Sequence, residues 1–337
     1  MIAMDFKTTL HIKPWKNTIR HTDNVMLIGS CFTEHMAGFL ERHKFHVLEN
    51  PHGILFNPIS IAHAVSRYVS EELYNTSDLF QHGEFWHSWF HHGRFSGTDA
   101  DACLSSINSS VVSAKSFIEK TQWLILTLGS AWAYELLPEA PNYKAGVICA
   151  NCHKIPASAF NHRLLKVNEV VDALRNICSS IKKVNAQTQI IFTISPVRHF
   201  REGLIENNRS KAVLQLAVHQ LLQEEAGCHY FPSYELVIDD LRDYRFYAED
   251  MVHPNYLATR YVWDKFKDAC ISPDDYDIME KAFKVSAALH HKPLYPESNA
   301  HQQFLQSTLQ LAQNLSDQYS YLDFSKEIEQ LKLALST

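Results

Sequence analysis

The sequence predicts an α/β protein in which a mostly parallel sheet lies between layers of helices. The chain has 337 residues, of which 46% are hydrophobic and 20% charged, so it can bury a large core. Short continuous apolar runs alternate with segments of helical periodicity, a pattern typical of parallel strands joined by helices. The predicted strands cover residues 25–28, 46–48, 123–128 and 189–194.

Helices are predicted where apolar residues recur three and four positions apart. Residues 161–183 and 210–225 show this spacing over several turns, and residues 34–43 and 256–269 follow it as well. Residues 78–97 are rich in aromatic side chains and fit no helix, so we expect an inserted hairpin or a long loop there.

The strand and helix alternation ends near residue 272. We therefore expect residues 1–272 to form one domain, with a core at about 22–270, and residues 273–337 to form a C-terminal helical extension. Three helical segments without intervening strands make up this extension: 277–289, 300–319 and 324–335. Their rows of Leu and Ala predict packing against the core or against a second subunit. In the second case the protein would be a homo-oligomer.

The glycines exclude several nucleotide-binding motifs. The chain has 10 Gly, and none of them forms a G-x-G pair. Dinucleotide-binding loops need G-x-G for a tight turn beside the pyrophosphate, and P-loops need a Gly-Lys pair that is absent here. The G-x-S-x-G motif of α/β-hydrolases is absent too.

Charge and apolar patterning exclude further classes of partner. With 31 Lys+Arg and 37 Asp+Glu, the net charge is −6, and no concentrated basic face predicts nucleic-acid binding. No apolar run is long enough for a membrane span, and the N-terminus lacks the apolar core of a signal peptide. We therefore expect a cytoplasmic protein with no membrane partner, in which the 7 Cys stay reduced.

Ser30 stands where the first predicted strand turns into a helix. The N-terminus of a helix favours a negative oxygen, so Ser30 is a candidate nucleophile. Two alternatives remain open at this position. Ser30 could act only as a helix N-cap, and the neighbouring thiol of Cys31 could be the nucleophile, because a helix N-terminus can lower a thiol pKa.

Asp250 and His253 form a candidate acid–base pair late in the chain. Side chains three residues apart on one turn lie side by side, so the Asp250 carboxylate could orient one nitrogen of His253 while the other faces a substrate. The alternative is a solvated turn in which Asp250 caps a helix.

Together these motifs resemble the GSCFA family, a branch of the SGNH (GDSL-like) hydrolases. The resemblance covers about residues 22–270 and rests on several phrases in the same order. These are Gly29-Ser30-Cys31-Phe32, the phrase at 50–58 (NPHGILFNP), the phrase at 126–132 (LTLGSAW), the phrase at 151–154 (NCHK), the phrase at 195–199 (SPVRH), and Asp250-x-x-His253.

The resemblance implies a three-layer α/β/α sandwich of the SGNH-hydrolase, flavodoxin-like type. It also implies that Ser30 attacks an ester carbonyl, that His253 takes the hydroxyl proton and returns it to the leaving alcohol, and that Asp250 stabilises the imidazolium. The implied activity is cleavage or transfer of an acyl ester, with an O-acyl group on a carbohydrate or small metabolite as substrate. No cofactor and no metal are implied.

The resemblance further implies an oxyanion hole that combines the N–H of the nucleophile, the N–H of a glycine and an Asn side chain. Gly53 is the candidate glycine. The third block, Gly129-Ser130-Ala131, has no Asn, so Ser130 or Asn57 would supply the donor beside Gly129, or the hole would be incomplete. Loss of one such donor typically lowers the rate by about a hundred- to a thousandfold.

Four further side chains are candidate substrate contacts: His92, His153, Arg198 and His199. Arg198 and His199 follow the predicted strand at 189–194, on the side where we expect the site, although Arg198 could equally form a structural ion pair. His153 ends a C-x-x-C-H string that starts at Cys149. A loop near the site is favoured over haem attachment, because no export signal is present.

Two alternative functions remain open. Four histidines between positions 82 and 92 (His82, His87, His91 and His92) could bind a metal, which would indicate a metal-dependent hydrolase. The favoured interpretation is that these side chains line or cover a pocket. The second alternative is a non-catalytic protein that keeps the pocket and binds a glycan or metabolite without turnover.

Overall fold

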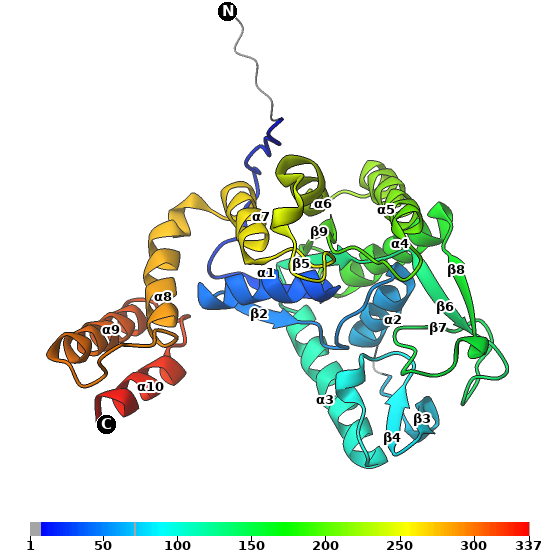
Figure 1. Ribbon diagram of the computed structural model, residues 1–337, viewed down its shortest axis with the longest axis horizontal. Coiled ribbons are helices and arrows are strands. Elements are labelled where there is room, and N and C mark those ends of the chain that lie inside the picture. Colours follow the sequence, from blue (N-terminus) through cyan, green and yellow to red (C-terminus); the bar gives the residue numbers. More distant parts are fainter. Residues whose placement is uncertain (1–7, 71, 337) are drawn as a thin grey trace, which may run out of the picture.

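A computed structural model describes residues 8–70 and 72–336, and a five-stranded parallel sheet lies at its centre (Figure 1). The strand order is β10-β9-β5-β1-β2. The strands are β1 (Asn24–Gly29), β2 (His46–Glu49), β5 (Trp123–Leu128), β9 (Gln189–Ile194) and β10 (Cys228–Tyr230). The four predicted strands are confirmed; β10, a short edge strand with a histidine at its centre, was not predicted because its apolar run is too short.

Helices cover both faces of this sheet, which confirms the predicted layers. Met26 and Ile28 of β1 pack in one core cluster with α2, α3, α4 and α5, while Val25 and Leu27 pack on the opposite face with α1 and α7. These helices are α1 (Cys31–Arg42), α2 (Pro58–Val69), α3 (Ala100–Ile118), α4 (Val167–Val184), α5 (Leu204–Glu224) and α7 (Tyr256–Cys270). Alternating side chains of one strand thus fill two separate cores.

The predicted helix at 161–183 is wrong over its first residues. Residues Phe160–Leu164 form strand β8, which pairs antiparallel with β6 (Trp132–Leu136), and β7 (Ile148–Cys149) pairs on the other side of β6. Helix α4 begins only at Val167, where the Glu169 carboxylate accepts the N–H of Lys166 at 2.9 Å. Apolar spacing alone does not reveal a strand that gains its partner from another part of the chain.

Helix α5 begins at Leu204, earlier than the predicted start at 210. Its buried face carries Asn207, Ser210 and Lys211 before the apolar residues Leu214 and Ala217 begin. The helix was predicted too short because polar residues occupy the first part of its buried face.

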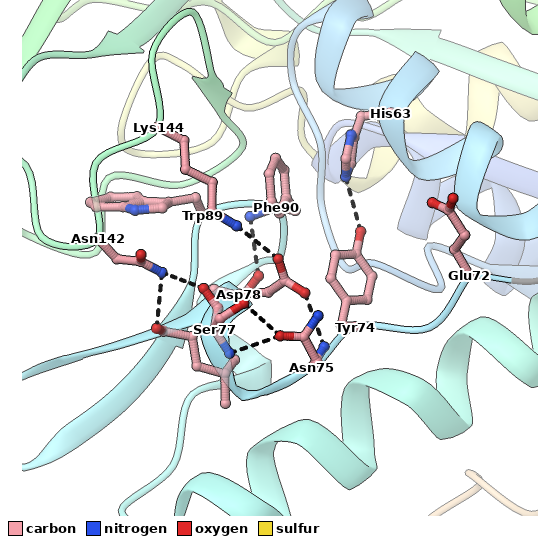
Figure 2. Close-up of polar contacts among 12 residues, drawn as sticks. His63, Glu72, Tyr74, Asn75, Ser77, Asp78, Trp89, Phe90, Asn142 and Lys144 are labelled. Atoms are coloured by element: carbon pink, nitrogen blue, oxygen red, sulfur yellow. Dashed lines mark hydrogen bonds and ion pairs between the residues drawn. The ribbon is translucent and has the colours of Figure 1, made fainter.

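The segment at 78–97 forms a hairpin, as predicted, with β3 (Leu79–His82) antiparallel to β4 (Phe85–Ser88). Figure 2 shows how it is fastened to the loop between β6 and β7. Nζ of Lys144 lies 2.9 Å from Oδ1 of Asp78, and Nδ2 of Asn142 donates to the carbonyl oxygens of Ser77 and Leu79. These contacts hold the hairpin and the β6–β7 loop together.

The C-terminal segment forms three helices with a small core of their own. They are α8 (Tyr276–Ala288), α9 (Asn299–Gln318) and α10 (Ser325–Ser336). Ile278, Val285, Leu315 and Phe324 are among the buried residues of this core, and Lys44 forms an ion pair with Glu327 at 2.6 Å. In Figure 1 these helices lie at the opposite end of the molecule from β6, β7 and β8.

Short helical turns complete the described chain. They are 3-10 turns at Thr76–Asp78, Gly93–Phe95, Ala157–Ala159, Tyr244–Phe246 and Pro273–Asp275, the short helix α6 (Ser233–Glu235), and a π-helical turn at Leu236–Leu241. Within residues 8–70 and 72–336, no helix combines the length and the apolar character needed to cross a membrane.

Candidate active site

The carboxyl ends of β1, β5 and β9 meet at one edge of the sheet, because all three strands are parallel neighbours. Ser30 follows β1, Gly129 and Ser130 follow β5, and Arg198 and His199 lie in the segment after β9. Sites of open α/β sheets form beyond this edge. The topology therefore gathers at one edge site residues that are far apart in the sequence.

Gly29 brings the chain against the neighbouring strand just before Ser30. Its φ is +150°, and a Cβ atom at this position would lie 2.2 Å from the carbonyl oxygen of Thr127. The N–H of Gly29 donates to Oδ1 of Asn50 at 2.8 Å, and the N–H of Ser30 donates to the Thr127 carbonyl at 3.1 Å. Only glycine fits this close approach.

The Ser30 hydroxyl is buried, and within residues 8–70 and 72–336 it has no hydrogen-bond partner. Ser30 occupies the N-cap position of α1, but its side chain makes no capping hydrogen bond. The residue is 1% exposed, and Oγ has no partner among the described residues. A buried hydroxyl without a partner is unfavourable for folding, so stability does not explain this serine.

Asp250 and His253 form a tight pair on the segment between residues 246 and 256. Nδ1 of His253 lies 2.6 Å from Oδ2 of Asp250, while Oδ1 accepts the N–H groups of Val252 and His253 at 2.9 and 3.0 Å. These hydrogen bonds lower the pKa of Asp250 to about 2, the backbone N–H of His253 being the largest cause. An ionised carboxylate only accepts, so Nδ1 carries the proton and Nε2 keeps its lone pair.

The His253 segment lies against the same edge of the sheet. The N–H of Arg198 donates to the carbonyl of Val252 at 3.2 Å, which joins this segment to the chain after β9. Burial lowers the pKa of His35 on α1 and the pKa of His199, and the charge of His253 contributes to the lowering of both. No hydrogen bond joins Ser30 to His253 in the described chain.

The predicted oxyanion donors are all engaged within the protein. The N–H of Gly53 donates to the Asn50 carbonyl at 2.7 Å, and the N–H groups of Gly129 and Ser130 both donate to the Phe56 carbonyl at 2.9 Å. Nδ2 of Asn57 donates to Oγ of Ser60 at 3.0 Å, since Asn57 caps α2.

The Ser130 hydroxyl, another candidate donor, is also engaged: its Oγ pairs with Oγ of Ser210 at 3.1 Å and accepts the N–H of Trp132 at 3.0 Å. The N–H groups of Gly53, Gly129 and Ser130 are thus used within the protein, whereas the Asn57 amide has a second N–H besides the one that donates to Ser60.

A pocket of about 320 Å³ opens beside Ser130. It contains two of the four predicted substrate contacts, His92 and His199. Its walls are formed by Phe56, Asn57, His92, Ser130, Trp132, Tyr134, Cys149, Ala150, Asn151, Cys152, His199, Arg201 and Glu202. Its volume falls in the range of small-molecule sites.

His153 and Arg198 do not line this pocket. Nε2 of His153 lies 2.8 Å from the Ser88 carbonyl oxygen, and the residue is buried beneath the hairpin. The guanidinium carbon of Arg198 lies 4.1 Å from the ring centre of Tyr247 and 5.0 Å from that of Tyr244. Arg198 therefore stacks on aromatic rings, and no ion pair within residues 8–70 and 72–336 includes it.

The surroundings of Cys31 disfavour the thiolate form that a reactive cysteine needs. Burial, followed by the charge of Glu34, raises its pKa. A raised pKa lowers the fraction of thiolate at neutral pH, which is the nucleophilic form.

The histidines at 82–92 and the cysteines of the C-x-x-C-H string make contacts within the protein. Within the described part of the chain, no group of three His, Cys, Asp or Glu side chains is placed to hold a metal ion. Nδ1 of His87 lies 2.7 Å from Oγ of Ser96, and Nδ1 of His91 lies 2.9 Å from Oγ of Ser88. Cys149 and Cys152 are free thiols with their sulfur atoms 3.9 Å apart.

Sequence reasoning missed two buried polar residues at this edge, Asn50 and Lys211. Asn50 is fully buried and fixes Gly29 through Oδ1, while its Nδ2 has no partner among the described residues. Lys211 is 1% exposed. A signal existed for Lys211, because it falls on the stripe that continues through Leu214 and Val218 at helical spacing.

Comparisons with known proteins agree with this architecture. Residues 24–266 match the family model described as the GSCFA family, and residues 283–337 match the model of a GSCFA domain protein, C-terminal domain. A comparison with curated proteins found no match.

Two solved structures are similar to the chain at low identity. One, a candidate platelet activating factor from Streptococcus pneumonia, is 14% identical over 73% of this chain and 83% of its own, with a TM-score of 0.36. The other, a carbohydrate esterase family 3 protein from Talaromyces cellulolyticus, is 9% identical over 77% of this chain and 98% of its own, also with a TM-score of 0.36.

Proposed function

Because the chain belongs to the GSCFA family, we propose that it is a serine hydrolase that cleaves an acyl ester through an acyl-enzyme on Ser30. One observation carries the proposal: a buried serine hydroxyl with no hydrogen-bond partner among the described residues lies at the sheet edge where the Asp250–His253 pair is also held. Folding gains nothing from an unpaired hydroxyl, whereas a nucleophile needs one.

The proposed reaction has two steps. Nε2 of His253 accepts the proton of Ser30 as Oγ bonds to the ester carbonyl carbon, and the same proton then goes to the leaving alcohol. Water, activated by His253, next attacks the acyl-enzyme and releases the acid together with free Ser30. If another alcohol replaces water in this second step, the product is a transferred ester.

Stabilisation of the oxyanion is assigned to the start of α1. The first N–H groups of a helix have no partner within the helix, and the helix dipole favours negative charge there. Cys31 and Phe32 are the first residues of α1, directly after Ser30. They take the place of Gly53, Gly129 and Ser130, whose N–H groups are engaged, and of Asn57, whose Nδ2 donates to Ser60.

The proposed alcohol part of the substrate is a carbohydrate or a small hydroxylated metabolite. The pocket beside Ser130 offers the aromatic rings of Trp132 and Tyr134 and the polar side chains of Asn151 and Glu202. Aromatic faces combined with a few amide and carboxylate groups suit a ring that carries hydroxyls.

A short-chain nitrophenyl ester and a fluorophosphonate probe test the proposal. Wild type should hydrolyse the ester and form a fluorophosphonate adduct on Ser30, and Ser30→Ala should lose both. Equal hydrolysis by wild type and Ser30→Ala would refute the esterase function. An adduct mapped to another residue would refute the assignment of the nucleophile.

A second candidate function is binding of a glycan or metabolite without turnover. The engaged donors of the predicted oxyanion hole favour it, because a hole with too few donors stabilises the transition state poorly. Under this function, wild type shows no turnover and no adduct, but a ligand of the pocket raises the melting temperature. A panel of acetylated and free sugars in a thermal-shift assay distinguishes the two.

A further inference from the structure

A buried lysine, Lys211, lies beneath the candidate active site, and the proposed reaction does not use it. Nζ of Lys211 on α5 donates to the carbonyl oxygen of Gly129 at 2.6 Å and to that of Ser195 at 2.7 Å. Gly129 follows β5 and Ser195 follows β9, so the ammonium joins the ends of two neighbouring strands. No ion pair within residues 8–70 and 72–336 includes Lys211.

The preceding residue of α5 strengthens the same attachment. Oγ of Ser210 accepts the N–H of Ala131 at 2.7 Å and pairs with Oγ of Ser130 at 3.1 Å. Two successive side chains of one helix therefore hold the loop at 129–131 by both its backbone and a side chain.

This loop borders the nucleophile. A Cβ atom added to Gly129 would lie 3.2 Å from Cβ of Ser30, so no other residue separates the two positions. The charge of Lys211 also reaches the site on two sides. Burial lowers the pKa of His199, and the charge of Lys211 lowers it further; burial raises the pKa of Cys31 on α1, and the charge of Lys211 opposes that rise.

Stability alone does not explain a lysine here. Burial of an ammonium is unfavourable, and an apolar side chain of similar volume often stabilises a core at least as well. Burial lowers the pKa of Lys211 to about 7.

Ester cleavage develops a negative charge on the carbonyl oxygen, and a buried cation acts strongly on such a charge because water does not screen it.

We propose that Lys211 is a positioning residue of the ester hydrolysis, which fixes the 129–131 loop beside Ser30 and holds a positive charge behind the oxyanion. This inference rests on the proposed function. Lys211 acts through Gly129 and through the electric field of its ammonium, without contact with the substrate. The protonated form is the active one.

The role predicts a specific pH dependence. The titratable groups that face Lys211 are Cys31 from α1, His199 from the segment after β9 and Tyr234 from α6, whose ring centre lies 6.0 Å from Nζ. As the pH rises through about 7, Lys211 loses its proton and kcat should fall, while the base His253 stays active.

The test compares Lys211→Met, Lys211→Arg and the control Lys183→Met with wild type, using a nitrophenyl ester between pH 5.5 and 9.5. Lys183 is an exposed lysine on α4, so its removal should change nothing. We expect Lys211→Met to lower kcat by about 10- to 100-fold with little change in KM, since it removes a remote charge, whereas a direct donor is worth about 10²–10³. Its alkaline decline in kcat should also disappear.

Lys211→Arg keeps a charge at all these pH values, so we expect it to retain most of the activity and to lose the alkaline decline. A folded Lys211→Met with wild-type kcat and pH profile would overturn the inference, and so would a variant whose melting temperature falls without a change in pH profile. If Lys211→Met does not fold, the comparison of wild type with Lys211→Arg decides. The same alkaline decline in both would overturn the inference.

The outcomes also separate this inference from the proposed function. If Ser30→Ala hydrolyses the ester as fast as wild type, the proposed function fails. If Ser30→Ala is inactive while the Lys211 variants match wild type, only the role of Lys211 fails.

Discussion

Nδ1 of His253 lies 2.6 Å from Oδ2 of Asp250, and the backbone N–H groups of Val252 and His253 donate to the other carboxylate oxygen. The carboxylate is thus fixed by three hydrogen bonds from its own turn. Such a turn can hold an imidazole in one tautomer without help from the rest of the fold.

Asp250→Asn should lower kcat for ester hydrolysis by about 10³–10⁴-fold, because an amide at this position favours the wrong His253 tautomer. Steady-state kinetics on a nitrophenyl ester measure it. Glu249→Gln is the matched control, since it removes the neighbouring exposed carboxylate. Equal activity of the two variants would contradict the role of Asp250.

Cys31→Ala should weaken ester cleavage only slightly, whereas Ser30→Ala should abolish it. Burial and the charge of Glu34 raise the pKa of the Cys31 thiol, so little thiolate is present near neutral pH. Kinetics of both variants, together with iodoacetamide labelling of Cys31 between pH 7 and 9, measure this. Retained turnover in Ser30→Ala with loss in Cys31→Ala would reverse the assignment.

Gly29→Ala should prevent correct folding of the sheet edge. The added Cβ would lie 2.2 Å from the Thr127 carbonyl oxygen, at a φ of +150° that other residues rarely adopt. Gly38→Ala is the control, because a Cβ at Gly38 meets no atom within 4 Å inside α1. It should raise the free energy of unfolding by about 0.5–1 kcal/mol. Urea unfolding of both variants measures the contrast.

The protein should lose stability in mild acid through its buried histidines. Burial lowers the pKa of His63 to about 4, and it lowers those of His52 and His91 as well. The unfolded chain takes up protons below about pH 6.5, whereas folded His63 does so only near pH 4. Its contribution is therefore complete above pH 6.5 and is lost as the pH falls towards 4.

For His63 alone the loss between pH 7 and pH 5 should be on the order of 2 kcal/mol. Urea unfolding at the two pH values measures it. His63→Phe keeps the stacking on Phe90, whose ring centre lies 4.0 Å away, and should reduce this pH dependence. An unchanged dependence would contradict the contribution of His63.

Trp132→Ala should raise KM for an acetylated sugar more than KM for a short nitrophenyl ester. The Trp132 ring lines the pocket beside Ser130, where it can stack on a sugar ring that the smaller ester lacks. The ratio of the two KM changes is the measurement, and the two substrates control for each other. An equal rise for both would argue against a sugar in this pocket.

The sequence predicted the central sheet well because its strands are buried on both faces. Residues 123–128 and 189–194 are continuous apolar runs, and both form strands with these bounds. Strands β6 and β8 were missed because they mix polar and apolar residues, and β7 was missed because it has only 2 residues. All three exist only through pairing with each other. Local pattern carries no information about a distant partner strand.

In the candidate site, too, local contacts follow from the sequence and long-range contacts do not. The sequence by itself determined the Asp250–His253 contact, since a spacing of three residues on one turn brings the two side chains together. It also determined the sharp turn before Ser30, because that turn needs the glycine at position 29. Only the tertiary structure decided which donors are free. The N–H of Gly53 donates to a carbonyl across a turn, and the N–H groups of Gly129 and Ser130 donate to a carbonyl far from them in sequence. It likewise decided that Lys211 lies beneath Ser30, since the packing of α5 on the sheet, and no local rule, brings that ammonium to the ends of β5 and β9.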